Sequence, residues 1–269
     1  MVDKLVLEDA WARVRRARVH LEELQALVAS VTDDPHSQQR AYPAIKSDEE
    51  LTIEFLVVGL KPIPDVPLIF SDLIHNLRAA LENAAMACYR RRGKLADPRD
   101  VTFPLVRDPA RWERTVGKVL PGVDQRLIEQ IRRFQPFSIE NRPFDEKRAP
   151  RHPLVVLHDL ARLDRHQRLH VARTTNDWGR VIFQARNAKQ TGSETIGAIM
   201  EEGKVLARFT FQAIDPSRPF DALVTGHEMR VAIEIDSEGP VLSVAAWLLQ
   251  FVEQVLGGLD ATAASIDMG

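Results

Sequence analysis

Residues 229–259 read MRVAIEIDSEGPVLSVAAWLLQFVEQVLGGL, and this stretch contains the two periodicities that decide the fold class. Apolar and charged residues alternate over 229–236, which is typical of a half-buried strand. After Gly239 the apolar residues recur every three or four positions, which predicts a helix that continues to about Leu259. The stretch therefore predicts a strand followed directly by a helix.

The same two patterns recur along the rest of the chain. Alternation predicts strands at about 51–60, 180–186, 204–214 and 229–236. Helical spacing predicts a long N-terminal helix over about 7–31 and further helices at about 68–92, 109–119, 123–134, 153–170 and 240–259. Residues 36–50 and 135–152 are polar and irregular, and Gly257-Gly258 predicts a helix stop with a fraying tail after it.

Helices come mostly first and strands mostly later in this order, which predicts an α+β fold that combines a helical bundle with an antiparallel sheet. The early strand and the final helix could close back on each other. We therefore expect a single interleaved domain over 1–269, with a helical part over about 1–170. A mainly β part with the final helix is expected over about 171–262.

Composition excludes several classes of protein. The 269 residues include 36 basic and 38 acidic side chains, so no global positive field attracts nucleic acid or anionic lipid. Cys88 is the single cysteine, which excludes a disulfide framework and is consistent with a reducing compartment. No apolar run approaches the roughly 20 residues of a membrane span, and the N-terminus lacks the pattern of a signal peptide. We expect a cytoplasmic protein without a membrane partner.

The predicted helix over 68–92 carries a row of polar residues. His75, Arg78 and Glu82 lie at i, i+3 and i+7, and therefore share one side of the helix. Asn83 lies on the adjacent ridge. Two interpretations stay open: a solvated face with an Arg78–Glu82 pair, or one wall of a polar binding pocket.

The predicted helix over 153–170 places a carboxylate, Asp164, among leucines. A buried carboxylate costs several kcal/mol unless it is paired or hydrogen-bonded. The helix could end at Leu163; Asp164 could pair with Arg78 or another arginine; or it could join an internal polar site with His75 or His166. We favour a pair with Arg78 that joins two helices and organises a pocket.

His166 and His170 are spaced i, i+4, which suits metal chelation on a helix. No glutamate follows the first histidine, so the zincin motif is missing, and no third ligand is evident. The sequence also lacks a nucleophile elbow and the glycine-rich phosphate loops. We therefore predict no metal site and no cofactor.

Three short motifs resemble, in order, those of a set of bacterial proteins, many of them actinobacterial, that have no established activity. LIHNLRAALEN at 73–83 resembles their HNLRxALDH, Phe103-Pro104-Leu105 their FPI, and LDRH at 163–166 their DKHR. The resemblance covers roughly residues 5–170. The first motif is also similar to the R-x4-6-H signature of HEPN domains. These are helical, usually dimeric modules, and many are metal-independent ribonucleases.

The HEPN resemblance implies an arginine that holds a phosphate and a histidine that acts as acid, base or positioning group. Asn83 stands where the signature beginning at Arg78 has histidine, and an amide cannot shuttle a proton. A second match implies a catalytic Arg165–His170 pair with His166 in support. The same spacing occurs at Arg13–His20, Arg15–His20 and Arg151–His158, and composition alone gives roughly two or three matches.

Three functions follow as hypotheses. The first is a non-catalytic or degenerate HEPN-like protein that binds a small ligand or a protein partner. The second is a metal-independent ribonuclease of the toxin or phage-defence kind, acting on RNA. The third is an assembly protein that forms a homodimer through its first helix.

Overall fold

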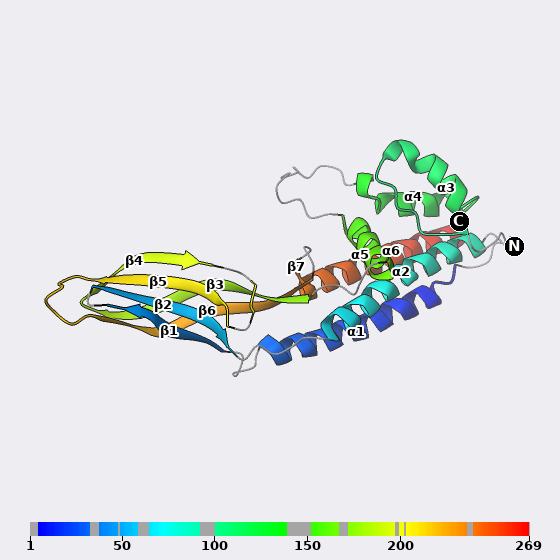
Figure 1. Cartoon of the computed structure of the whole chain (residues 1–269). Helices are drawn as coiled ribbons and strands as arrows, with labels where there is room; N and C mark the ends of the chain where they lie inside the picture. The colour runs from blue at the N-terminus through cyan, green and yellow to red at the C-terminus, as the bar shows by residue number, and fades with distance from the viewer. Residues whose placement is uncertain are drawn as a thin grey trace. The chain divides into compact units, whose positions relative to one another are not determined.

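The structure is a computed structural model that describes residues 5–32, 38–47, 49–58, 65–91, 100–138, 152–166, 172–196, 199–201, 203–235 and 239–268 (Figure 1). It confirms an α+β fold. The chain forms two compact units, each assembled from separate stretches of sequence. The helical unit comprises Met1–Leu24, Leu68–His170 and Leu242–Gly269, and the strand unit comprises Gln25–Pro67 and Val171–Val241. In contrast with the expected grouping, the final helix belongs to the helical unit.

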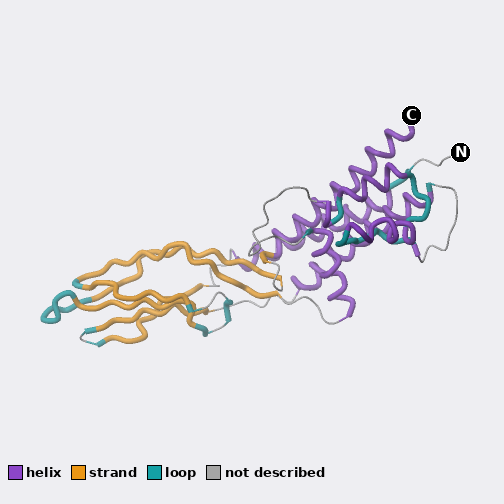
Figure 2. The backbone as a smooth tube through the Cα atoms, turned by 90° about the horizontal axis from the view of Figure 1, so that it is seen from above, coloured by secondary structure: helices purple, strands orange, loops and turns teal. Residues whose placement is uncertain are grey.

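Long and short helices make up most of the described part of the helical unit, as the tube in Figure 2 shows. The long helices are α1 (Glu8–Thr32), α2 (Asp65–Arg90) and α6 (Val241–Asp267). The shorter helices are α3 (Trp112–Val119), α4 (Gln125–Arg133) and α5 (Pro153–His166), with single 3-10 turns at η2 (Pro109–Arg111) and η3 (Pro136–Ser138). The predicted helices over 109–119 and 123–134 are therefore confirmed.

The apolar stripe of α1 is buried within the chain. Its members in the helical unit are Leu7, Ala10, Val14, Ala17, Leu21 and Leu24. Polar contacts hold the same helix against α6, because Trp11 Nε1 donates to Asp260 Oδ2 at 2.8 Å and Arg18 lies 2.5 Å from Glu253. This stripe is therefore not free for a two-chain coiled coil. A homodimer stays a prediction, and it would need another surface.

The predicted helix stop at Gly257-Gly258 is wrong. Helix α6 continues through both glycines to Asp267, and the predicted fraying tail is its last two turns. A Cβ added at Gly258 would clash with the side-chain amide of Gln130 and lie 3.3 Å from Phe134 of α4. A side chain at this position would require Gln130 to move and would press against Phe134, which favours glycine here.

Among the described residues, one helix is long and apolar enough to cross a membrane. This is α6, whose most apolar window has a mean hydropathy of 1.4. Half of that window is buried within the chain, and a core helix of a protein that never enters a membrane meets the same criterion. The feature is weak evidence for a membrane span, and the expected absence of a membrane partner stays a prediction.

The strand unit is built from two antiparallel sheets. The first has the order β1-β2-β5-β4, with β1 (Gln38–Lys46), β2 (Glu50–Val58), β5 (Val205–Ala213) and β4 (Ala188–Thr195). The second has the order β3-β6-β7, with β3 (Ala172–Arg186), β6 (Asp221–Ile235) and β7 (Gly239–Pro240). The predicted strands over 51–60 and 204–214 correspond to β2 and β5, whereas β3 and β6 are longer than predicted.

One apolar cluster contains residues of both sheets. It includes Leu51, Ile53 and Phe55 of β2, Phe211 of β5 and Ala222 of β6. The Phe183 ring of β3 lies 5.0 Å from the rings of both Phe209 and Phe211, measured between centroids. These contacts show that the two sheets pack face to face as a sandwich.

Three described strands do not appear in the sequence prediction: β1, β4 and the two-residue β7, which lies where the final helix was expected to begin. Strand β1 occupies part of 36–50, which was expected to be irregular, and β4 has a polar sequence with little alternation. Both β1 and β4 are edge strands of the first sheet. An edge strand has only one neighbour to satisfy, so β1 tolerates Pro43 beside a bulge and β4 needs no apolar face.

Candidate functional site

Arg78 and Glu82 of α2 form an ion pair that binds the backbone of Phe103. Arg78 Nη2 donates to the Phe103 carbonyl at 3.4 Å, and Glu82 Oε2 accepts from the Phe103 N–H at 2.8 Å. The Arg78 side chain is only 12% exposed. Its Nη1 atom is buried without a hydrogen-bond partner among the residues the structure describes. The pair is therefore a largely buried clamp on the chain rather than a solvated surface pair.

The predicted polar pocket also included His75, Asn83 and Asp164. His75 and Asn83 are half-buried on α2, and neither lines the pocket described below. Helix α5 continues to His166, so the interpretation that it ends at Leu163 is wrong. The side chain of Asp164 lies outside what the structure describes, and its pairing with Arg78 stays a prediction.

The catalytic residues implied by the HEPN resemblance also lie beyond the described part of the chain. Arg165 and His166 belong to the last turn of α5, where no side chain is described, and His170 falls in the undescribed segment 167–171. Their proposed catalytic roles stay predictions.

A buried glutamine holds the segment that follows Phe103. Gln135 is fully buried at the end of α4, where its amide receives the Val106 N–H at 2.9 Å and donates to the Pro104 carbonyl at 3.1 Å. With the clamp on Phe103, these bonds satisfy four backbone groups of residues 103–106 without a sheet or helix. The next residues, Arg107 and Asp108, are therefore presented from a fixed backbone.

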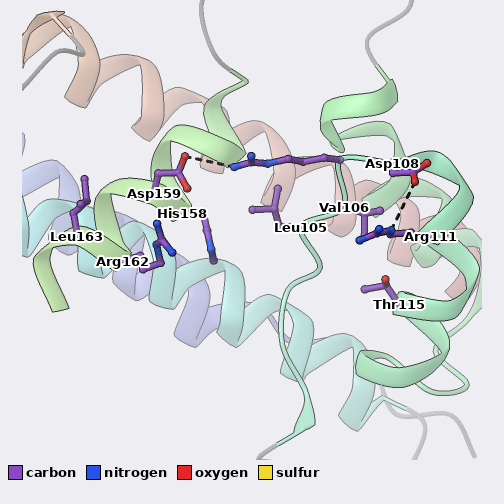
Figure 3. A pocket seen from close by; sticks show the side chains of 10 residues that line it. Leu105, Val106, Asp108, Arg111, Thr115, His158, Asp159, Arg162 and Leu163 are labelled. Atoms are coloured by element: carbon purple, nitrogen blue, oxygen red, sulfur yellow. Dashed lines mark hydrogen bonds and ion pairs between the residues drawn. The ribbon is translucent and has the colours of Figure 1, made fainter. Parts of the chain in front are cut away.

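Side chains of this segment and of α5 line a pocket of about 730 Å³ within the helical unit (Figure 3). One side consists of residues from the segment 105–115, and the other consists of residues of α5. The lining residues are Leu105, Val106, Arg107, Asp108, Arg111, Thr115, His158, Asp159, Arg162 and Leu163.

Local helix geometry explains how the first side is arranged. Asp108 caps η2, because its Oδ1 accepts from the Ala110 N–H at 3.0 Å and Pro109 follows at the first position. Trp112 and Val116 then bury the inner side of α3. Thr115 is spaced i+4 from Arg111, so both side chains line the pocket from one side of the helix.

Three arginines and two aspartates supply the charge of the pocket. Arg107 Nη2 lies 3.5 Å from Asp159, and Arg111 Nε lies 3.7 Å from Asp108. Both arginines are well exposed, at 63% and 80%. Arg162 is also exposed and makes no ion pair with a described acidic residue. Exposed pairs of this length contribute between about 0 and 1 kcal/mol, so an incoming anion can replace them.

His158 is the half-buried titratable group of the pocket. Burial lowers its pKa below the usual 6.5, and the positive charges of Arg78, Arg162 and Arg107 act in the same direction. Asp159 acts against them. His158 is therefore a neutral imidazole near pH 7, with one nitrogen that donates and one that accepts.

Sequence reasoning missed most of this pocket. In the sequence, His158 stood out only as the histidine of the Arg151–His158 match to the R-x4-6-H signature. Nothing distinguished this match from the others. Leu163 continues the apolar spacing of its helix, but it is 38% exposed at the pocket. The predicted helix over 109–119 already placed Arg111 in its first turn, but no feature of the sequence marked this arginine as a pocket residue.

In the described part of the chain, no group of three or more His, Cys, Asp or Glu side chains lies close enough to hold a metal ion. Cys88 is buried, and burial raises the pKa of its thiol to about 12, so the sulfur stays protonated and unreactive.

No protein-family model matches this chain, and no curated protein or solved structure is significantly similar to it. The resemblance to HEPN domains therefore stays a prediction, and the function must be argued from the pocket itself.

Proposed function

We propose that this is a ligand-binding protein whose helical unit takes an anionic ligand with an apolar portion. The observation that carries the proposal is the set of three arginines around one pocket, of which Arg162 has no acidic partner among the described residues. Planar guanidinium groups form paired, charge-assisted hydrogen bonds with carboxylates and phosphates.

The balance of charge in the pocket supports binding of an anion. Three guanidinium groups face two carboxylates, so the lining is net positive while His158 is neutral. One of the two carboxylates, Asp108, also accepts the Ala110 N–H as the cap of η2, so its charge is shared with the backbone. Leu105, Val106 and Leu163 add an apolar surface, as in most small-molecule sites.

The Arg78 side chain supports a binding role over catalysis at the first HEPN-like motif. It is engaged with Glu82 and the Phe103 carbonyl, and it stabilises the segment that lines the pocket. Asn83, at the position of the signature histidine, cannot exchange a proton.

Calorimetric titration tests the proposal. Phenyl phosphate and benzoate serve as anionic probes, and benzyl alcohol serves as the neutral control. We expect one binding site for at least one anion, none for the alcohol, and about tenfold weaker binding in Arg162→Gln. Arg126→Gln in α4, which does not line the pocket, is the matched control. Absence of binding by both anions would overturn the proposal.

Metal-independent RNA cleavage is a second candidate, and one observation favours it. A neutral histidine lies in a pocket with three arginines, and these groups could accept a proton and hold a phosphodiester. Labelled RNA incubated with the protein in EDTA tests this activity. Cleavage that is lost in His158→Ala would support it, and intact RNA would exclude it.

A further inference from the structure

We infer that the pocket prefers a phosphate monoester over other anions, and that His158 takes up a proton from solvent when this ligand binds. The inference rests on the proposed function, because it names the ligand class and the pH dependence of the same pocket. It follows from the donors that line the pocket and from the charges around His158.

The donors suit a tetrahedral head group. Arg107, Arg111 and Arg162 offer guanidinium N–H groups, and Thr115 adds a hydroxyl from α3. A phosphate monoester presents three acceptor oxygens and carries nearly two negative charges above about pH 7, since its second pKa is about 6. A carboxylate has two acceptor oxygens and one charge, and a sulfate ester has three oxygens and one charge. Comparing the three ligands therefore separates the effect of head-group shape from the effect of head-group charge.

Charged groups on α2, on the 105–108 segment and on α5 act on His158. Arg78 on α2, Arg107 on the 105–108 segment and Arg162 on α5 all disfavour the imidazolium, and among the described residues Asp159 favours it. Burial of the ring adds to the effect of the arginines. The free pocket therefore keeps His158 neutral near pH 7.

A bound dianion reverses this balance. Its two charges oppose those of the three arginines, and a nearby negative charge favours the imidazolium form. Once protonated, His158 donates from both ring nitrogens and can add a charge-assisted hydrogen bond to the ligand. By linkage, a ligand that takes up a proton binds more weakly as pH rises. A monoanion provides half of this charge and therefore takes up less.

Calorimetry in two buffers with different heats of ionisation tests the inference, with phenyl phosphate, phenyl sulfate and benzoate as probes. Between about pH 7 and 8, where the phosphate is already a dianion, we expect phenyl phosphate affinity to fall by at least about threefold, with net proton uptake. Phenyl sulfate should bind about tenfold more weakly than phenyl phosphate at pH 7. His158→Gln should bind phenyl phosphate with no pH dependence. Its thermal midpoint shows whether it is folded.

The outcomes separate the two proposals. Equal affinity for phenyl phosphate and phenyl sulfate, or phosphate binding without proton uptake by the wild-type protein, overturns this inference and leaves the binding function standing. Persistence of the pH dependence in a folded His158→Gln variant also overturns it. Failure of all three anions to bind overturns the binding function and this inference together.

Discussion

Arg107 Nη2 lies 3.5 Å from Asp159 Oδ2, and this ion pair joins the 105–108 segment to α5 across the candidate pocket (Figure 3). The distance is long and the arginine is well exposed, so the pair contributes little stability. Under the proposed function its main effect would be on the ligand, because Asp159 partly neutralises an arginine that would otherwise face an anion.

Replacing Asp159 with asparagine should strengthen anion binding. The variant removes a negative charge from the pocket and releases Arg107, so we expect phenyl phosphate to bind about three- to tenfold more tightly at low salt. Asp72→Asn, which removes the same charge from an exposed position on α2 outside the pocket, serves as the control. Unchanged or weaker binding in Asp159→Asn alone would contradict this role.

The clamp on Phe103 should make a coupled contribution to stability. Arg78→Ala and Glu82→Ala each leave a partly buried charge without its partner, and each should lower the free energy of unfolding by about 2 kcal/mol. The double variant should lose clearly less than the sum, as denaturant titration can show. Arg90→Ala, at an exposed position of the same helix, should change stability by less than about 0.5 kcal/mol. Additive effects would mean that the pair does not act as one unit.

Adjacent glycines in α6 should respond differently to alanine. Gly257 has open space where a Cβ would be, so Gly257→Ala should stabilise the helix by about 0.5–1 kcal/mol. Gly258→Ala must displace Gln130 and press against Phe134, so it should be about 1–3 kcal/mol less stable than Gly257→Ala. Thermal unfolding of the two variants measures the difference. Equal stabilisation would show that α4 does not pack closely at Gly258.

His152 should make the folded state sensitive to acid. Burial lowers the pKa of this histidine from 6.5 to about 4, and its Nδ1 accepts the Leu154 N–H at 3.2 Å at the start of α5. Between about pH 4 and pH 6.5, the His152 side chain binds a proton in the unfolded chain but not in the folded chain. The contribution of His152 is therefore fully present above about pH 6.5 and is lost as pH falls towards 4.

His152→Asn removes the titrating group but keeps a side-chain acceptor that can cap α5. Urea titrations across this pH range should show a smaller loss of stability in the variant than in the wild-type protein. Parallel curves for the two proteins would show that His152 does not control the acid response.

The regular elements could be predicted because their periodicity reflects burial. The alternation over 51–60 puts Leu51, Ile53, Phe55 and Val57 on one face of the predicted strand, and all four are buried in β2. The edge strand β4 could not be found this way, since most of its side chains are exposed and its sequence shows little alternation. Gly258 misled the prediction, because its close neighbour on α4 is a tertiary contact that no local pattern contains.

The site was less predictable than the fold. The Arg78–Glu82 pair followed from i, i+4 spacing, but its attachment to Phe103 required the fold. The arginines of the pocket come from an irregular segment and from α5, and each resembles a surface residue when read alone. Only their convergence on one pocket distinguishes these arginines from ordinary surface residues.

The central claim is that Arg107, Arg111 and Arg162 bind one anion together. The most direct measurement follows the side-chain Nε–H resonances of the arginines by NMR while phenyl phosphate is added. We predict that these three resonances shift with one common dissociation constant, while those of Arg126 and Arg132 on α4 stay unchanged. Shifts spread evenly over all arginines, or no shift at these three, would contradict the claim.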